Sequence, residues 1–243
     1  MNYNLKKDVT LVCVDGSDSE ASLKALNFSN RNILFENVKL ISTSRPVSDL
    51  GMVEYHEIPG MTWNGYNDFV CNKLNDYIET NFCITIQTDG FITNPHLWND
   101  DFFKYDYIGA PWPDEDVWLN LQYQKTRESY IENEKKSRVG NGGFSFRSKK
   151  FLEESSKYSS CMGYGEDAFL CIMNYKNLLE SGILFPDVET ALKFSIENPV
   201  KEMGYCWPNL DAGFNSSLAF GFHGKYIADY ERKIKEMREY EKK

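Results

Sequence analysis

Short apolar runs alternate with helix-like segments through the first ninety residues, and this alternation constrains the fold more than any other feature. The runs Val9–Val14, Val38–Ser42 and Phe82–Ile86 carry few polar side chains, which is typical of strands buried on both faces. Between them, Ala21–Phe28 and Asn64–Thr80 place apolar residues at helical spacing. The order of these segments predicts parallel βαβ units and therefore an α/β fold.

The second half of the chain has a different character. Tyr107–Pro113 predicts a short strand that breaks into a proline-containing loop, and the polar residues 114–138 predict an insertion with some helix. Further segments predict helices at Lys149–Tyr158 and Glu166–Leu179, a short strand at Lys193–Glu197, a turn at Gly221–Gly224 and a charged helix over 226–243. Because no linker or repeat divides the sequence, we expect one domain over residues 1–243.

Charge and cysteine content narrow the function classes. The formal net charge is −9 and no basic patch stands out, which disfavours nucleic-acid binding. The six cysteines form no C-x-x-C pair, so we expect free, buried thiols in a reducing compartment. No run approaches the roughly 20 apolar residues of a membrane span, and no secretory leader is evident. We therefore expect a cytoplasmic protein.

Two residues are candidate ligands of a divalent cation. Asp89 follows the strand Phe82–Ile86, and ligands of open parallel sheets bind beyond the carboxyl ends of strands. Its carboxylate suits Mg²⁺ or Mn²⁺, although Asp89-Gly90 is equally a common turn. His223 lies between glycines in Phe220–Gly224, where a neutral imidazole can bind Mn²⁺ or serve only a structural role.

Glu166 and Asp167 open a predicted helix directly after the loop Gly163–Gly165. Negative charge is favourable at a helix N-terminus, so capping alone explains the pair. The alternative is a general base that takes a proton from a hydroxyl group. Because neighbouring positions do not share a helix face, the two carboxylates can have different roles.

Gly140–Gly143 contains three glycines in four residues, which lets the backbone approach a ligand closely. The run lacks the lysine and the following helix of a Walker-type phosphate loop, so we exclude that interpretation. Arg138 and Arg147 flank the run, and either can pair with a phosphate or with a carboxylate of the protein.

Taken in order, five motifs resemble a family. They are Gln87–Gly90 (QTDG), Tyr105–Trp112 (YDYIGAPW), Gly140–Arg147 (GNGGFSFR), Glu166-Asp167 and Phe220–Gly224 (FGFHG). The set resembles GT-A-fold glycosyltransferase-like domains of microbes, fungi and viruses, over roughly residues 82–224. The resemblance implies a GT-A-like α/β fold. In it, a Rossmann-like nucleotide-sugar-binding half (about 1–100) and an acceptor half (about 101–225) share one mixed sheet, and a C-terminal helix follows.

The resemblance also implies a reaction. A transferase of this kind moves a hexosyl or pentosyl group from a nucleotide-sugar donor to a hydroxyl of a glycan or other acceptor, here with inversion. GT-A enzymes hold Mn²⁺ or Mg²⁺ with a strand-end D-x-D motif, and the matching stretch, Gln87-Thr88-Asp89, has one carboxylate. His223 stands where a late histidine completes such a metal site. Asp167 is the expected base, with Glu166 as the second candidate.

The other expected site residues follow from the resemblance or from their position in the βαβ pattern. The donor-binding residues are Asp15, Arg45, Gln87, Thr88, Gly90, Gly142 and Gly143. The acceptor-binding residues are Trp112, Asn141 and Tyr164, with Trp118 as a further aromatic side chain in the insertion.

Two other functions remain open. A non-catalytic nucleotide- or carbohydrate-binding module would keep the fold without the chemistry, and the missing first Asp of D-x-D favours it. The presence of Asp89, Glu166, Asp167 and His223 together favours an enzyme. A metal-dependent phosphoesterase would use the same carboxylates, but such enzymes usually need more His and Asp ligands.

Overall fold

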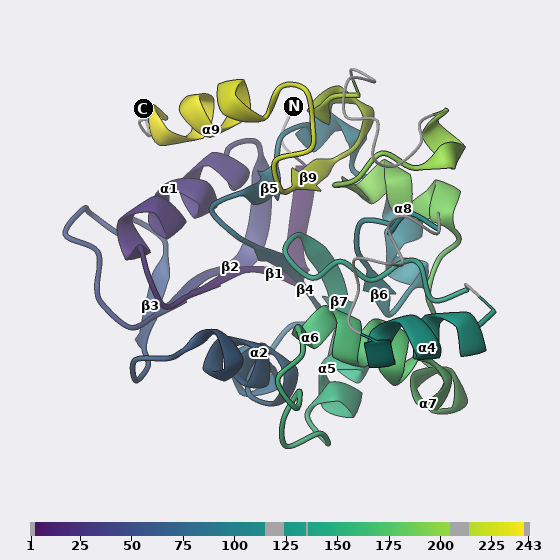
Figure 1. The fold of residues 1–243 in the computed structure, drawn as a ribbon. Helices are drawn as coiled ribbons and strands as arrows, with labels where there is room; N and C mark the ends of the chain where they lie inside the picture. Colours follow the sequence, from purple (N-terminus) through teal and green to yellow (C-terminus); the bar gives the residue numbers. More distant parts are fainter. Residues whose placement is uncertain (1–2, 115–123, 135, 205–213, 241–243) are drawn as a thin grey trace.

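A six-stranded mixed sheet forms the centre of the molecule (Figure 1). The computed structural model describes residues 3–114, 124–134, 136–204 and 214–240. The strand order is β3-β2-β1-β4-β7-β6, in which the first four strands are parallel and β7 and β6 are antiparallel to their neighbours. Their bounds are β1 Tyr3–Asp15, β2 Ile33–Ser42, β3 Glu54–Glu57, β4 Phe82–Ile86, β6 Tyr107–Ile108 and β7 Ser145–Ser148. The α/β prediction is confirmed, and this sheet takes strands from both halves of the chain.

A second sheet of three strands lies beside the first. It has the order β5-β9-β8, with β5 at Gly90–Ile92, β8 at Ser195–Ile196 and β9 at Gly221–His223. The prediction of a turn at Gly221–Gly224 is wrong, because Gly221–His223 pairs along its whole length with β5. A three-residue strand is too short to show alternation in the sequence. Its partner β5 lies about 130 residues earlier in the chain.

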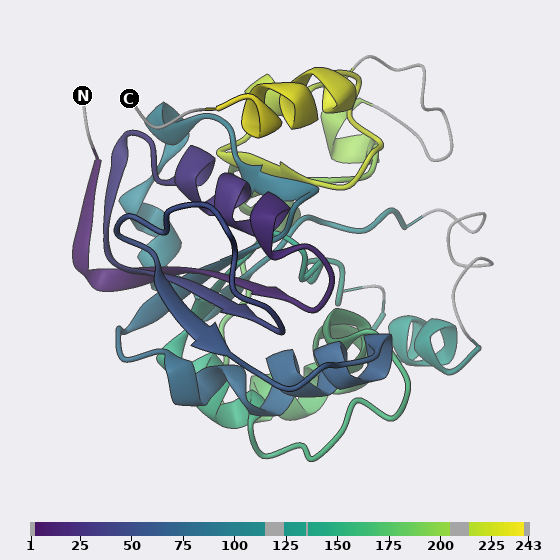
Figure 2. The ribbon, with the colours of Figure 1, turned by 90° about the vertical axis from the view of Figure 1, so that its left-hand side faces the viewer.

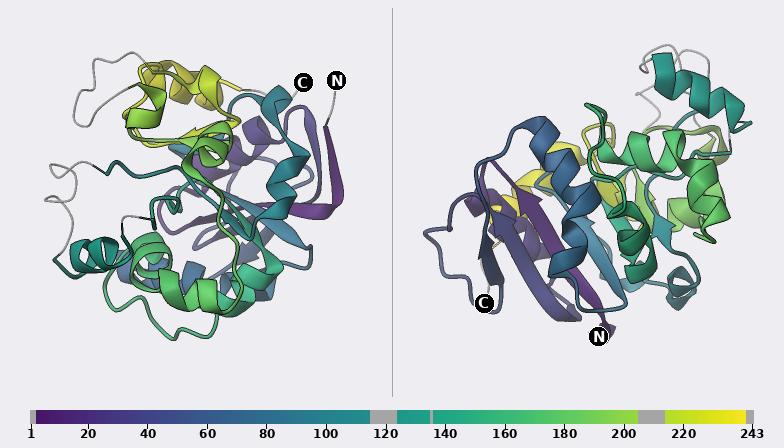
Figure 3. Two further views of the ribbon diagram at one scale, coloured as in Figure 1. Left: turned by 90° about the vertical axis from the view of Figure 1, so that its right-hand side faces the viewer. Right: turned by 90° about the horizontal axis from the view of Figure 1, so that it is seen from below.

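Helices cover both faces of the central sheet, as Figures 2 and 3 show. One face carries α1 (Ser19–Ser29) with α9 (Tyr230–Arg238) packed on it, and the other carries α2 (Trp63–Asn72) and α5 (Lys149–Ser155). The remaining α-helices of the described residues are α4 Gln124–Glu132, α6 Glu166–Ala168, α7 Tyr175–Glu180 and α8 Val188–Phe194. Of the described residues, no helix is long and apolar enough to cross a membrane.

Two predicted helices are divided in the structure. α2 ends at Asn72, not at Thr80, and the 3₁₀ turn Leu74–Tyr77 continues its buried side through Leu74 and Ile78. The segment Glu166–Leu179 forms α6, a π-turn over Phe169–Met173, and α7. The same apolar spacing accommodates each of these helix types, so the sequence pattern does not distinguish them. Five cysteines are free and buried, as expected, and Cys206 lies outside the described residues.

Candidate active site

A cleft of about 440 Å³ opens at the carboxyl ends of β1 and β4. The strand order reverses here, because β1 has β2 on one side and β4 on the other. Ligands of open α/β sheets bind at such a switch point, and the volume suits a small-molecule site. The lining residues come from the end of β1, the start of α1, the start of α2 and the turn after β4; among them are Asp15, Ser22, Met61, Trp63, Tyr66, Gln87, Thr88 and Asp89.

At the α1 end of the cleft, carboxylates of the protein accept hydrogen bonds from backbone amides. Asp15 Oδ1 accepts hydrogen bonds from the Ser17 backbone N–H (3.1 Å) and hydroxyl (2.8 Å), and Oδ2 accepts from the Asp18 N–H (2.6 Å). Asp18 in turn caps α1 by accepting from the Ala21 N–H. The backbone amides of Ser17, Asp18 and Ala21 at the start of α1 are therefore already satisfied. The expected donor residue Arg45 is exposed, lies 5.6 Å from the centre of the Tyr55 ring, and does not line the cleft.

Asp89 and His223, the two expected metal ligands, lie close together. His223 Nε2 is 3.7 Å from Asp89 Oδ1 and 3.1 Å from the side-chain oxygen of Gln87. The turn that carries Asp89 is held by two backbone hydrogen bonds between Gln87 and Gly90, and the Gly224 N–H donates to the Asp89 carbonyl. The pairing of β5 with β9 therefore brings these distant segments into one place.

Two glycines make room for the His223 ring. A Cβ atom on Gly143 would lie 2.1 Å from His223 Nε2, and one on Gly90 would lie 2.7 Å from His223 Cδ2. Neither position therefore accepts a side chain without displacing the imidazole. This contact explains why both the glycine-rich run and the turn after β4 contain glycine at these positions.

Hydrogen-bond acceptors face both ring nitrogens of His223. Nδ1 is 3.1 Å from Glu197 Oε1, and Nε2 faces Gln87 and Asp89. A neutral imidazole has only one N–H, so with the Gln87 oxygen facing Nε2, as here, a second proton or a cation at Nε2 would satisfy this arrangement. Burial alone lowers the pKa of His223, but the hydrogen bond and charge of Glu197, together with Asp89 and Asp167, raise it overall. The donor set thus fits a divalent cation held between Asp89 and His223.

Glu166 and Asp167, the two candidate bases, have different environments. Arg147 is fully buried and donates two hydrogen bonds to Glu166, at 2.8 Å to Oε1 and 3.3 Å to Oε2. Glu166 is therefore bound in a buried ion pair. Asp167 is half-buried and accepts hydrogen bonds from the backbone N–H groups of Gly142 (3.1 Å) and Ala168 (2.7 Å). Burial, followed by the charge of Glu166, raises the pKa of Asp167 from 3.8 to about 6.

The glycine-rich run connects these groups. Asn141 accepts a hydrogen bond from the Gly143 N–H (3.2 Å) and donates to Glu197 Oε2 (3.0 Å). Gly142 contacts Asp167 through its N–H, and a Cβ at Gly142 would lie 2.0 Å from Glu166 Oε1. Gly140–Gly143 therefore lies between the candidate metal ligands and the candidate base.

Several other expected site residues are buried or paired with other side chains of the protein. Trp112 is only 6% exposed and packs against Gly140, so its ring is not available for stacking on a sugar. Tyr164 is half-buried and packs against the apolar cluster that contains Trp112. Arg138 pairs with Glu202 and Arg147 with Glu166, so neither arginine is free to bind a phosphate. Trp118 lies outside the described residues.

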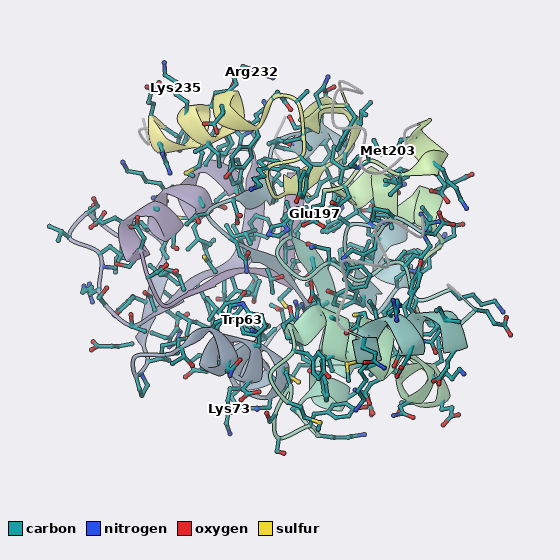
Figure 4. The ribbon with its side chains drawn as sticks, in the orientation of Figure 1. Trp63, Lys73, Glu197, Met203, Arg232 and Lys235 are labelled. Carbon is teal, nitrogen blue, oxygen red and sulfur yellow. The ribbon has the colours of Figure 1, made fainter. Side chains whose placement is uncertain are left out.

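Three residues at the site were not found from the sequence. Figure 4 shows Trp63 at the start of α2 and Glu197 near the centre of the molecule. Trp63 is 58% exposed although it lines the cleft. Tyr66, one turn further along α2, accepts a hydrogen bond from Gln87 Nε2 at 2.6 Å. The polar Glu197-Asn198 pair at the end of a predicted strand was the available signal for Glu197, but its partner is 26 residues away.

Two solved structures to which the chain is similar in fold are GT-A-type glycosyltransferases. An active-site variant of LgtC is 10% identical and has a TM-score of 0.50, with 94% of each chain covered. The apo form of mouse xyloside xylosyltransferase 1 is 13% identical, also with a TM-score of 0.50, over 93% of this chain and 98% of that one. At these identities the likeness establishes the fold, which is GT-A-like.

The chain belongs to the family described as "Protein of unknown function (DUF5672)", whose model matches residues 55–223. This range contains Asp89, Asp167, Glu197 and His223, while Asp15 lies before it. No curated protein sequence matches the chain.

Proposed function

We propose that this protein is a metal-dependent glycosyltransferase that moves a sugar from a nucleotide donor to a hydroxyl acceptor. The observation that carries the proposal is the meeting of Asp89 and His223 beside the switch-point cleft, with Asp167 across the glycine-rich run. The GT-A-like fold supports the reaction class.

The charge distribution suggests how the donor lies in the cleft. The described residues that line it include Asp15 and Asp89 but no Lys or Arg. Three amides at the α1 end, those of Ser17, Asp18 and Ala21, already donate to Asp15 and Asp18. The nucleoside therefore fits the end between β1 and α2, where Trp63 offers an exposed ring, and the diphosphate fits the end near Asp89 and His223.

The chemistry assigns one task to each group. Asp89 and His223 would hold a divalent cation, which neutralises the charge that develops on the leaving diphosphate. Asp167 accepts the proton of the acceptor hydroxyl as it attacks the anomeric carbon, with inversion. A base with a pKa near 6 is ionised at neutral pH and still basic enough to take this proton. The ion pair with Arg147 leaves Glu166 to fix the position of its neighbour.

A donor screen by thermal unfolding tests the proposal. UDP-, GDP-, CMP- and dTDP-sugars are each added with Mn²⁺, with Mg²⁺ or with a chelator. We expect one nucleotide to raise the melting temperature only when the metal is present. A ligand at a hundred times its dissociation constant adds about 2.7 kcal/mol to the free energy of unfolding.

Two variants make this screen specific. Asp89→Ala should abolish the metal-dependent shift, whereas Asp8→Asn changes an exposed carboxylate on β1 and should preserve it. Hydrolysis or transfer of the sugar, measured with the same donor, then separates an enzyme from a binding module. Binding without any turnover would support the non-catalytic alternative, and no nucleotide-dependent shift under any condition would refute the donor site.

A further inference from the structure

We infer that Glu197 is a positioning residue that fixes the tautomer of His223 and leaves Nε2 free for the divalent cation. This inference rests on the proposed function, because it explains the orientation of His223 by its role as a metal ligand. No sequence motif pointed to Glu197, and the side chain lies at the end of β8, two residues before Pro199.

The Glu197 carboxylate is held by three partners. Oε2 accepts hydrogen bonds from the side-chain amides of Asn198 (2.7 Å) and Asn141 (3.0 Å), and Oε1 faces His223 Nδ1 at 3.1 Å. Asn198 is 5% exposed and the Glu197 side chain is 13% exposed. With two donors fixed at Oε2, the orientation of the carboxylate is determined before the histidine is considered.

This orientation determines where the histidine proton lies. A carboxylate is a stronger hydrogen-bond acceptor than the Gln87 amide oxygen, so the single proton of a neutral ring resides on Nδ1 and is donated to Glu197. Nε2 then presents its lone pair toward Asp89. The Gln87 amide can rotate to place its NH₂ group at Nε2 and its oxygen at the Tyr66 hydroxyl. A carboxylate behind a ligating histidine is a recurrent way to orient the ring and raise its basicity.

The variant Glu197→Gln tests this role sharply. If Glu197 fixes the tautomer, the substitution should move the ring proton of His223 from Nδ1 to Nε2 and not only weaken a contact. The two asparagine donors require an oxygen at the Oε2 position, so the new amide must place its NH₂ group against His223 Nδ1. Nδ1 then becomes the acceptor, and the ring proton moves to Nε2. The variant keeps the size and the hydrogen bonds of the original side chain, so we expect the fold to be preserved.

Two measurements report on this change. Long-range ¹H–¹⁵N NMR at mildly alkaline pH reads the tautomer of each histidine directly. The chain has only three histidines, and a His223→Gln sample assigns the relevant signal. We expect the Nδ1–H tautomer in the wild type and the Nε2–H tautomer in Glu197→Gln. Titration of Mn²⁺ followed by electron paramagnetic resonance should show an affinity about 10- to 100-fold lower in the variant.

Glu189→Gln is the matched control, since it makes the same change at an exposed position on α8 and should alter neither measurement. An Nε2–H tautomer in the wild type, or equal Mn²⁺ affinity in Glu197→Gln and wild type, would overturn the role of Glu197 while leaving the metal site intact. A wild type that binds no Mn²⁺ would instead overturn the metal site of the proposed function, and with it the purpose of this tautomer.

Discussion

At the scale of single residues, Asp167 is held in a state that favours reactivity over stability. Its carboxylate is half-buried next to Glu166, and the backbone N–H groups of Gly142 and Ala168 stabilise its negative charge. A raised pKa means that the folded protein binds this proton more tightly than the unfolded chain does. The carboxylate therefore contributes stability below pH 4 and loses that contribution as the pH rises through about 6.

Asp167→Asn should accordingly separate stability from activity. At neutral pH the variant lacks the unfavourable charge, so we expect its free energy of unfolding to rise by on the order of 1 kcal/mol, or ~2–4 °C in melting temperature. The gain should shrink as the pH falls toward 4, where wild-type Asp167 is protonated. Sugar transfer should be lost at every pH. A pH series of thermal unfolding curves measures the effect, and a gain that is the same at pH 4 and pH 8 would contradict it.

The candidate site shows what a sequence can and cannot reveal about residues. Asp89 follows a strand end and His223 lies in a glycine-flanked motif, and the structure brings them within 3.7 Å. Their roles as metal ligands remain a prediction. Glu197 and Tyr66 were missed because each acts through a partner distant in the chain. Trp112 and Arg147 have the chemistry of ligand-binding residues, and only their burial indicates otherwise.

At the scale of secondary structure, one buried ion pair joins β7 to α6. Arg147 on β7 has no exposed surface and lies over the Tyr107 ring, while Glu166 opens α6 and is 5% exposed. Asn67 of α2 also accepts a hydrogen bond from the Glu166 N–H at 2.8 Å. The position of Asp167 therefore depends on three elements that meet at its neighbour.

Glu166→Gln should destabilise the whole fold. The substitution leaves the Arg147 charge buried without a counter-ion, which typically costs about 3–5 kcal/mol. Glu134→Gln is the matched control, because it removes an exposed ion pair with Lys136 that contributes little to stability. Urea unfolding of both variants measures the difference. Equal losses would show that the buried pair is not a major source of stability.

Predictions of secondary structure succeeded where the hydrophobic pattern lay within one continuous segment of the chain. Phe82–Ile86 was predicted with its observed bounds, because four apolar residues and one β-branched threonine between polar residues form the pattern of a buried strand. α2 and its 3₁₀ continuation share one buried side, so the apolar spacing did not reveal the break after Asn72. The residues of β9 were predicted to form a turn. Their strand pairing with β5 and β8 depends on segments far away in the sequence, which the local pattern does not reveal.

At the scale of the whole molecule, the candidate site joins the two halves of the chain. Asp89 belongs to the turn between β4 and β5, and His223 ends β9 near the C-terminus. The small sheet that unites them lies beside the central sheet. Its backbone pairing, the hydrogen bond from the Gly224 N–H to the Asp89 carbonyl and the 3.1 Å contact of His223 Nε2 with Gln87 connect the two segments. A cation held by both side chains would add a direct connection between the halves.

Hydrogen exchange should reveal this connection. With Mn²⁺ and the matching nucleoside diphosphate at about a hundred times the dissociation constant, opening that releases the ligand becomes roughly 100-fold rarer. We expect slower amide exchange at residues 87–92 and 221–224, where the two ligands and their strands lie. α7 should exchange as before, because Tyr175–Glu180 does not line the cleft. Protection confined to residues 15–22 would place the phosphates at the α1 end instead. That result would contradict the proposed donor orientation. The phosphates would then lie where the Asp15 and Asp18 carboxylates accept hydrogen bonds from backbone amides in this structure.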